Sequence, residues 1–296
     1  MNTILYWLAR ALVACVQRLP LEFVARLGRA GGGLAFHLDG RHRRVVLDNL
    51  TLCFGKEKSA AEIRAIAREN FRRIGENYLA AVKTAAMSFD LLRPHVEFSG
   101  LENLPKTISG VTQANAVVAI GHFGNFELYA RLGDAHPHGK FATTFRALKQ
   151  PALNRLMQDL RGRSHCQFFE RRADGRALRA LLGGGGITLG LLADQSSVGL
   201  RAPFLGRDCN TGLAPAVLAL RYHAELSTAI CYRVAPAKWR LEFGEKIPTH
   251  ENGQPRSSEG IMRDVNRALE AAVRRDPANW FWVHKRWKIP KPEVRS

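Results

Sequence analysis

Residues 116–127 read AVVAIGHFGNFE, and this stretch decides the fold. The segment Ala116 to Ile120 is a run of small and β-branched apolar residues, which predicts a strand buried on both faces. The glycines that follow predict a tight turn, and Phe126 to Leu132 predicts the start of a helix. A buried strand that leads through a turn into a helix is the repeating unit of proteins with a parallel sheet.

The same alternation continues through the rest of the chain. Apolar runs predict further strands at 187–193, 226–234 and 239–243. Helical patterns occur at 62–82, 151–161, 175–182, 214–223 and 261–274. The glycine run 183–186 lacks the spacing of a phosphate-binding loop and is interpreted as a helix stop and turn. We therefore expect an α/β fold with a largely parallel central sheet flanked by helices.

The first forty residues do not show this alternation of strands and helices and instead have helical patterns. Apolar residues recur at helical spacing from Ile4 to Val16, with Arg10 on another face. Thirteen residues are too few to cross a bilayer, which takes about 20. The segment either packs into the core or lies in a membrane interface with its arginines at lipid phosphates, and we favour the interface. A second amphipathic stretch, 21–36, is broken in this interpretation by three glycines at 31–33.

The chain is strongly basic. Its 44 Lys and Arg against 26 Asp and Glu leave a formal charge of +18. Such a surface attracts polyanions, namely nucleic acid, an anionic bilayer, a phosphorylated lipid or an acidic carrier protein. A mean hydropathy of -0.17 excludes a polytopic membrane protein. Five scattered cysteines without a C-x-x-C pair argue against a disulfide framework or a zinc site.

The turn after the first buried strand carries the sharpest chemical signal. His122 lies on that turn, and Glu127 lies five residues later on the predicted helix. A carboxylate on the first helical turn can reach back to one imidazole nitrogen, leaving the other free as a general base. Gly121 and Gly124 permit the tight turn, and the helix N-terminus offers N–H groups to an oxyanion. The alternative is a structural histidine that caps the helix.

The block GHFGNFE resembles the H-x4-D/E motif of the glycerolipid-type acyltransferase superfamily, and more narrowly that of the bacterial lipid A late acyltransferases. Further blocks resemble the same family in the same order over nearly the whole chain. They are RHRRVVLDNLTLCF (41–54), FRALKQPALNRLMQDLRGR (145–163), ITLGLLADQ (187–195), APFLG (202–206) and NRALEAAVRRDPANWFWVHKRWK (266–288).

The resemblance implies transfer of a fatty acyl chain from a thioester, on acyl carrier protein or coenzyme A, to a hydroxyl of a phosphorylated glycolipid. A lipid A precursor is the expected acceptor, at the cytoplasmic face of the inner membrane. His122 is expected to be the base and Glu127 to orient it, with no metal or cofactor, because the thioester is already activated. Residues 1–40 then form a membrane-associating helical segment, and residues 41–296 form the acyltransferase domain.

Further residues are expected to bind the substrates. They are Gly124, Asn125, Arg146, Arg161, Arg163, Asp194 and Gln195. We expect Arg146 to bind the acceptor phosphate or polarise the thioester carbonyl. Asp194 follows a strand and is expected to orient a basic residue of the site. Arg161 and Arg163, together with Arg171 and Arg172, are interpreted as one surface for a polyanion such as an acidic carrier protein.

Two other functions remain open on the sequence alone. The same chemistry on another polar lipid, such as a phosphatidylinositol mannoside or a lysophospholipid, differs only in the acceptor. A non-enzymatic polyanion-binding protein would use the charge alone. No recognised nucleic-acid motif is present, so nucleic acid is not an expected partner. The interleaved Trp280, Trp282, His284 and Trp287 are interpreted as a core plug or an interface anchor.

Overall fold

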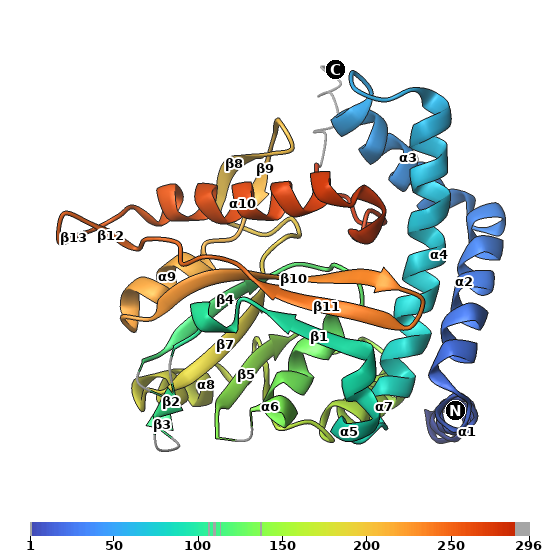
Figure 1. Cartoon of the computed structure of the whole chain (residues 1–296), viewed down its shortest axis with the longest axis horizontal. Helices are drawn as coiled ribbons and strands as arrows, with labels where there is room; N and C mark the ends of the chain where they lie inside the picture. Colours follow the sequence, from blue (N-terminus) through green and yellow to red (C-terminus); the bar gives the residue numbers. More distant parts are fainter. Residues whose placement is uncertain (1, 106, 109–110, 113, 137, 288–296) are drawn as a thin grey trace, which may run out of the picture.

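A seven-stranded sheet forms the centre of the protein in the computed structural model (Figure 1), which describes residues 2–105, 107–108, 111–112, 114–136 and 138–287. The strand order is β1-β11-β10-β4-β7-β5-β6. The strands are β1 (Val96–Ser99), β4 (Ala116–Ile120), β5 (Lys140–Phe145), β6 (Cys166–Glu170), β7 (Ile187–Leu192), β10 (Glu225–Ala235) and β11 (Lys238–Phe243). All neighbours pair in parallel except β10 with β11. The predicted α/β fold with a largely parallel sheet is confirmed.

Helices cover both faces of this sheet. One face carries α8 (Gly175–Gly183), α9 (Ala214–Arg221) and α10 (Ser258–Arg275). The other face carries the 3-10 helix η3 (Phe126–Arg131) with α6 (Leu132–Ala135) and α7 (Pro151–Arg161). The fully apolar β4 serves both layers, because Val117 and Ala119 point into one core cluster and Val118 and Ile120 into the other. Right-handed crossovers between parallel strands produce such a two-sided arrangement.

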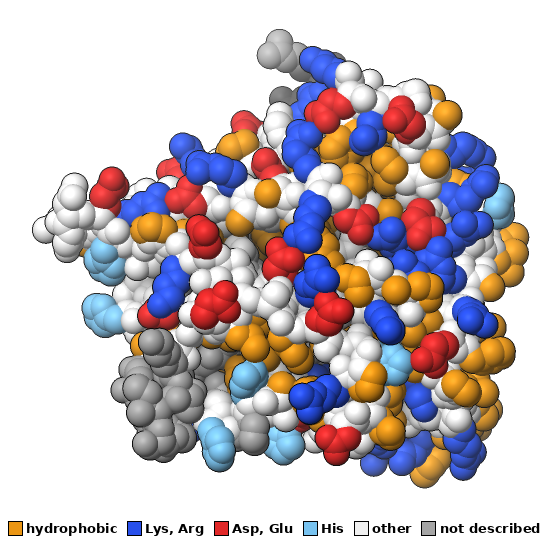
Figure 2. Space-filling view, viewed as in Figure 1, with side chains coloured by type: hydrophobic (Ala, Val, Ile, Leu, Met, Phe, Trp, Pro, Cys, Tyr) orange, Lys and Arg blue, Asp and Glu red, His pale blue; other side chains and the backbone are white. Residues whose placement is uncertain are grey.

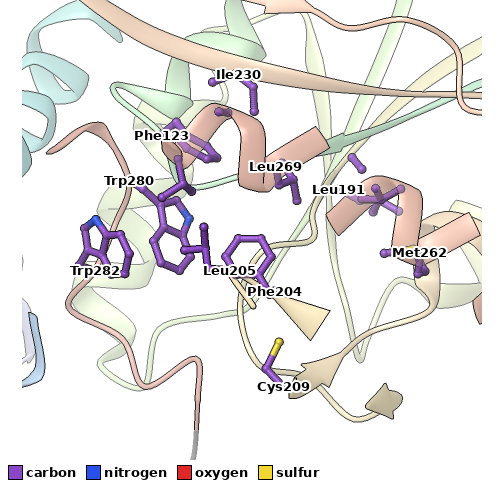
Figure 3. Close-up of a cluster of buried hydrophobic side chains, with 14 of the residues drawn as sticks. Phe123, Leu191, Phe204, Leu205, Cys209, Ile230, Met262, Leu269, Trp280 and Trp282 are labelled. Atoms are coloured by element: carbon purple, nitrogen blue, oxygen red, sulfur yellow. The ribbon is translucent and has the colours of Figure 1, made fainter. Parts of the chain in front are cut away.

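Short elements complete the domain. They are the 3-10 turns η1 (Arg93–His95), η2 (Leu101–Asn103) and η4 (Pro277–Asn279), the helix α5 (Phe89–Leu92), and the hairpins β2 (Thr107–Ile108) with β3 (Val111–Thr112), β8 (Leu200–Phe204) with β9 (Arg207–Thr211), and β12 (His250–Glu251) with β13 (Gln254–Pro255). The C-terminal aromatic segment fills the core. Trp280 and Trp282 are fully buried and pack edge to face with ring centroids 4.6 Å apart (Figure 3). The interpretation of these residues as a core plug is confirmed; Lys288, the last residue of that sequence block, lies outside the described residues.

Four long helices precede the sheet at one side of the molecule (Figure 1). They are α1 (Asn2–Arg18), α2 (Leu21–Leu38), α3 (Gly40–Phe54) and α4 (Ala60–Thr84). The prediction that three glycines break the second helix was wrong, since α2 continues through them. Gly32 faces α4 so closely that a Cβ atom there would lie 2.1 Å from the carbonyl oxygen of Phe71. Glycine therefore serves close packing of α2 against α4 rather than a break.

The helix α1 has one packed face and one exposed face. Its packed face lies on α7, where the Tyr6 hydroxyl donates a 2.8 Å hydrogen bond to Asp159. The outer faces of α1 and α2 expose large apolar side chains, visible among arginines at the edge of the molecule in Figure 2. These are Ile4, Trp7, Leu8, Leu12, Phe23, Leu27, Leu34 and Leu38. Within the described part of the chain, none of the helices has the length and apolar character needed to cross a membrane.

Candidate active site

The turn after β4 places His122 against the end of β7. Because β4 and β7 pair in parallel, their carboxyl ends lie side by side at one edge of the sheet. The Nδ1 atom of His122 lies 2.7 Å from Oδ1 of Asp194, and the backbone N–H of His122 donates to Oδ2 at 2.8 Å. The basic partner expected for Asp194 is therefore His122.

Asp194 is fully buried, and a third donor fixes its carboxylate. The indole N–H of Trp280 donates to Oδ2 at 2.7 Å. Burial alone would raise the pKa of Asp194, but the adjacent His122 ring and its hydrogen bonds hold that pKa well below the usual range. An ionised carboxylate only accepts hydrogen bonds, so Nδ1 of His122 carries the proton and Nε2 is left unprotonated, as an acceptor.

The free nitrogen faces few protein groups. The Gln195 amide nitrogen lies 3.4 Å from Nε2 of His122, and the imidazole packs edge-on against Phe126 with centroids 4.9 Å apart. Phe281 lies on a further side at 5.9 Å. The His122 side chain remains 15% exposed. A ring oriented by a buried carboxylate, with its other nitrogen accessible, has the arrangement of a general base.

Glu127 does not orient His122, and that expectation was wrong. Its carboxylate pairs instead with Arg161 of α7, whose Nη2 lies 2.6 Å from Oε1 and whose Nε lies 3.2 Å from Oε2. The guanidinium also lies over the rings of Phe145 and Phe168. The segment after the turn is a six-residue 3-10 helix with three residues per turn, and it brings Glu127 within reach of α7. Asp194, on the adjacent strand end, occupies the position beside the imidazole.

The glycine and asparagine of the motif shape the turn. Gly124 has a φ of +51°, and a Cβ atom there would lie 2.4 Å from the carbonyl oxygen of Cys231. Only glycine fits this left-handed position without strain. The buried Asn125 side chain lies 3.5 Å from the Thr84 hydroxyl on α4. The helix that begins here is the 3-10 helix η3 rather than a regular α-helix, and its first N–H groups as oxyanion donors stay a prediction.

Two hollows meet at His122. The first, which we call the apolar pocket, lies between α4, η3, α7 and η4. Its apolar lining includes Ile74, Tyr78, Ala81, Met157, Leu160 and Phe281, and Gly124, Asn125 and Glu127 also border it. The second, which we call the polar cleft, crosses the carboxyl ends of the strands. Its polar lining includes Arg146, Asn154, Arg171, Gln195, Ser196 and Ser197.

The predicted arginines do not form one surface. Arg146 is exposed in the polar cleft, as expected for a substrate contact. Arg161 is paired with Glu127 inside the site. Arg163 precedes β6 and Arg171 follows it, so the two lie at opposite ends of a five-residue strand, about 17 Å apart along its axis. Arg163 is not among the described residues that border either hollow, and its role in substrate binding stays a prediction.

Trp280 and Phe281 were missed as site residues, although their sequence block had been singled out. Their backbone pairs with the catalytic turn: Phe123 bridges Trp280, and the N–H of Phe281 donates to the His122 carbonyl at 3.0 Å. Among the described residues, no group of three or more His, Cys, Asp or Glu is arranged to hold a metal ion. Burial raises the pKa of the nearby Cys166 thiol to about 12, so this thiol stays protonated and is a poor nucleophile.

Comparison with known proteins agrees with this chemistry. The family model described as bacterial lipid A biosynthesis acyltransferase matches residues 1–289. The lipid A biosynthesis palmitoleoyltransferase of Escherichia coli (strain K12) is 26% identical over 295 residues, covering 96% of this chain and 91% of that protein. The lipid A biosynthesis acyltransferase of Shigella flexneri is similar to the same extent. The Escherichia coli lipid A biosynthesis myristoyltransferase is 35% identical over 100 residues, 32% of this chain and 29% of that protein.

Proposed function

Because the chain belongs to the bacterial lipid A biosynthesis acyltransferase family and is an acyltransferase, we propose that it transfers a fatty acyl chain from a thioester to a hydroxyl of a phosphorylated lipid A precursor. The observation that carries the proposal is the His122–Asp194 pair, set where the apolar pocket meets the polar cleft. Family membership sets aside the non-enzymatic interpretation of the positive charge.

In the proposed reaction His122 acts as the general base. Its Nε2 takes the proton of the acceptor hydroxyl while the oxygen attacks the thioester carbonyl. As the tetrahedral intermediate collapses, the carbon–sulfur bond breaks, and the imidazolium returns the proton to the departing thiolate. Asp194 remains ionised and stabilises the imidazolium in between. The Gln195 amide, 3.4 Å from Nε2, is near enough to donate a hydrogen bond to the carbonyl oxygen of a bound thioester.

The two hollows suit the two kinds of chemical group in the substrates. Hydrocarbon is stabilised where it leaves water, and the apolar pocket next to His122 offers a continuous apolar lining. We assign the acyl chain to it. Arg146 lines the polar cleft and has no ion pair with any residue that the structure describes, and its planar guanidinium matches the oxygens of a phosphate. We assign the acceptor phosphate to Arg146.

The outer faces of α1 and α2 support peripheral association with the cytoplasmic face of the inner membrane. Their exposed leucines, Trp7 and Phe23 form an apolar surface that a bilayer interface would cover. The packed face of α1 lies on α7, which carries Met157 and Leu160 of the apolar pocket. An enzyme held by α1 would therefore place this pocket next to the lipid phase that holds its acceptor.

The proposal is tested with purified protein in mixed micelles, given an acyl thioester and a lipid A precursor, with products read by mass spectrometry. We expect one added acyl group on the precursor and none on a lysophospholipid supplied in parallel. Arg146→Lys keeps the positive charge but loses the planar guanidinium, which can donate two parallel hydrogen bonds to a phosphate. The KM for the acceptor should therefore rise about tenfold. Exclusive acylation of the lysophospholipid would overturn the proposed acceptor, and absence of any acylated product would overturn the proposed function.

A further inference from the structure

The segment 278–284 lies between the N-terminal helices and the catalytic turn, and we call it the C-terminal strap (Figure 1). On the side of the turn, the N–H of Phe281 donates to the His122 carbonyl at 3.0 Å, and the Asn279 carbonyl accepts the N–H of Gly124 at 3.1 Å. After Asn279, none of the strap residues, all of which the structure describes, belongs to a regular helix or strand. Side chains of other elements therefore have to fix much of its course.

The side chain of Asn70 on α4 holds the part of the strap that contains Trp280. Asn70 is only 1% exposed, and its Nδ2 donates hydrogen bonds to the carbonyl oxygens of Ala278, at 2.9 Å, and of Trp280. Its own Oδ1 accepts no hydrogen bond from any residue that the structure describes. The bonds that compensate for the burial of this amide therefore all go to the strap.

Asn49 on α3 makes the same kind of contact further along the strap. Its Nδ2 donates to the carbonyl oxygens of Trp282, at 2.9 Å, and of His284, at 2.8 Å. Together the two asparagines bind the carbonyl group of every second residue from 278 to 284. The strap is thus fixed at regular intervals to two helices that precede the sheet.

Asn70 holds the backbone of the residue whose side chain fixes the catalytic carboxylate. The indole N–H of Trp280 donates to Oδ2 of Asp194 at 2.7 Å, and Oδ1 of Asp194 lies 2.7 Å from Nδ1 of His122. The indole is fully buried and packs edge to face against Trp282 (Figure 3), so it has little freedom to turn on its own. A displacement of the backbone at position 280 therefore moves the indole and, with it, the carboxylate.

An asparagine at position 70 does not favour the helix in which it lies. Asparagine has a lower helix propensity than leucine, and Ile63 and Ala67, which share its face of α4, are apolar and buried. A leucine of similar size would suit both the helix and the core, but it would leave two strap carbonyls without their donor. Binding of the strap is thus the physical reason for an asparagine here.

We propose that Asn70 is a positioning residue of the catalytic pair and that it acts through Trp280. Asn70 fixes the backbone of Trp280, the indole fixes Asp194, and Asp194 orients the imidazole of His122 for proton transfer. This inference rests on the proposed acyl transfer, in which His122 is the base. A misplaced base slows proton transfer without weakening substrate binding, so the loss of Asn70 should appear in kcat rather than in KM.

The first test compares Asn70→Leu with the matched control Asn115→Leu. Asn115 is also buried, and its Nδ2 donates to the carbonyl of Leu182 at 3.0 Å. It precedes β4, whereas His122 follows this strand, so the five residues of β4 place about 17 Å between them. Both variants remove a buried amide donor, and urea unfolding measures how much stability each of them loses.

We expect kcat to fall about tenfold in Asn70→Leu, with the KM for donor and acceptor little changed, and to stay at the wild-type value in Asn115→Leu. Asn70→Ser keeps one hydroxyl donor, so its kcat should lie between those of the wild type and Asn70→Leu, and it replaces Asn70→Leu if that protein does not fold. Asn70 also borders the apolar pocket. A loss that appears only in the KM of the donor, or an unchanged kcat, would overturn the positioning role.

A double variant tests whether Asn70 acts through Trp280. Trp280→Phe lacks the indole N–H that holds Asp194, so the further loss of Asn70 should matter little. We expect kcat of Asn70→Leu with Trp280→Phe to lie within about threefold of kcat for Trp280→Phe alone. Losses that multiply in the double variant would show that Asn70 acts by another route.

The position of the indole can be followed without any turnover. The chain has five tryptophans, so protein labelled with ¹⁵N-tryptophan gives up to five indole N–H signals, and the signal of Trp280 is the one lost in Trp280→Phe. We expect this signal to shift in Asn70→Leu, because the hydrogen bond to Asp194 changes, and to stay in place in Asn115→Leu. An unshifted signal in Asn70→Leu, or an equal shift in both variants, would overturn the inference. If the signal depends on Asn70 but the wild type transfers no acyl chain, the proposed function fails and the contact from Asn70 to Asp194 stands.

Discussion

The Nδ1 atom of His122 lies 2.7 Å from Oδ1 of Asp194, although 72 positions separate the two residues in the sequence. The contact exists because β4 and β7 end side by side in a parallel sheet. The second carboxylate oxygen takes the backbone N–H of His122 and the indole N–H of Trp280. Three distant segments therefore hold one buried carboxylate against one imidazole, which fixes the ring and its tautomer.

The first prediction concerns the tautomer. In Asp194→Asn the amide can donate to Nδ1 and move the ring proton to Nε2, which removes the base. We expect kcat to fall by about 10³-fold or more, with substrate KM values little changed. Steady-state kinetics on protein shown to be folded by circular dichroism checks this. A fall of less than about tenfold would contradict the role assigned to Asp194.

Trp280→Phe provides the matched control for this variant. It removes one donor to Asp194 but keeps an aromatic ring in the buried position. Since the backbone N–H of His122 still holds the carboxylate, the loss in kcat should be much smaller, about tenfold.

The second prediction separates Glu127 from the base. Because Glu127 pairs with Arg161, Glu127→Gln and Arg161→Gln should each lower kcat/KM. The kcat/KM of the double variant should be no lower than that of the less active single variant. The pH dependence of kcat should keep its wild-type midpoint in all three, since neither residue touches the imidazole. Strictly additive losses, or a displaced midpoint in Glu127→Gln, would favour direct contact with His122.

Sequence reasoning located the catalytic turn but misassigned the partner of the histidine. His122 and Glu127 are close along the chain, and a regular helix after the turn would have been compatible with their contact. The 3-10 geometry of η3 and the pairing of β4 with β7 are long-range outcomes that no local spacing encodes. Asp194 was recognised as an orienting residue because it follows a buried strand, which the parallel-sheet rule identifies as a site position.

The strands were predicted where the core demands continuous apolar residues. The fully buried β4 and the whole of β7 were predicted, whereas β5 and β6 were missed. The strands β5 (KFATTF) and β6 (CQFFE) lie towards the free edge of the sheet and are only partly buried. Their residues therefore do not form an uninterrupted apolar run. The glycines at 31–33 of α2 were misread because the close contact of Gly32 with α4 is a tertiary feature.

The third prediction concerns stability at acid pH. The pKa of Asp194 is lower in the folded protein than in the unfolded chain, so its stabilising contribution is present above about pH 4 and is lost as the pH falls through its folded value. Burial also lowers the pKa of His284, so the unfolded chain binds this proton more readily than the folded protein does. The folded protein therefore also loses stability as the pH falls below about 6.5.

Urea unfolding at a series of pH values measures this dependence. The free energy of unfolding should decrease continuously from pH 7 towards pH 3 in the wild type. Asp194→Asn should have a shallower slope below about pH 4 than the wild type. A stability that rises on acidification, or identical slopes in the two proteins, would contradict the buried ionised carboxylate.

The fourth prediction concerns the outer face of α1. Leu8 and Leu12 are 64% and 67% exposed, so Leu8→Glu with Leu12→Glu should leave the fold intact and weaken vesicle binding by about tenfold or more. Co-sedimentation with vesicles containing anionic lipid measures the bound fraction. The control is Val217→Glu with Val234→Glu, two exposed valines on α9 and β10. Equal binding by both variants would show that α1 is not the membrane-contacting element.

The most direct test of the central claim is the rate of acyl transfer by His122→Ala in a single turnover, with donor and acceptor both saturating. If His122 is the general base, the rate should fall by about 10²- to 10⁴-fold while the fold, donor binding and vesicle binding remain as in the wild type. A folded His122→Ala protein that transfers the acyl chain at a near wild-type rate would contradict the account.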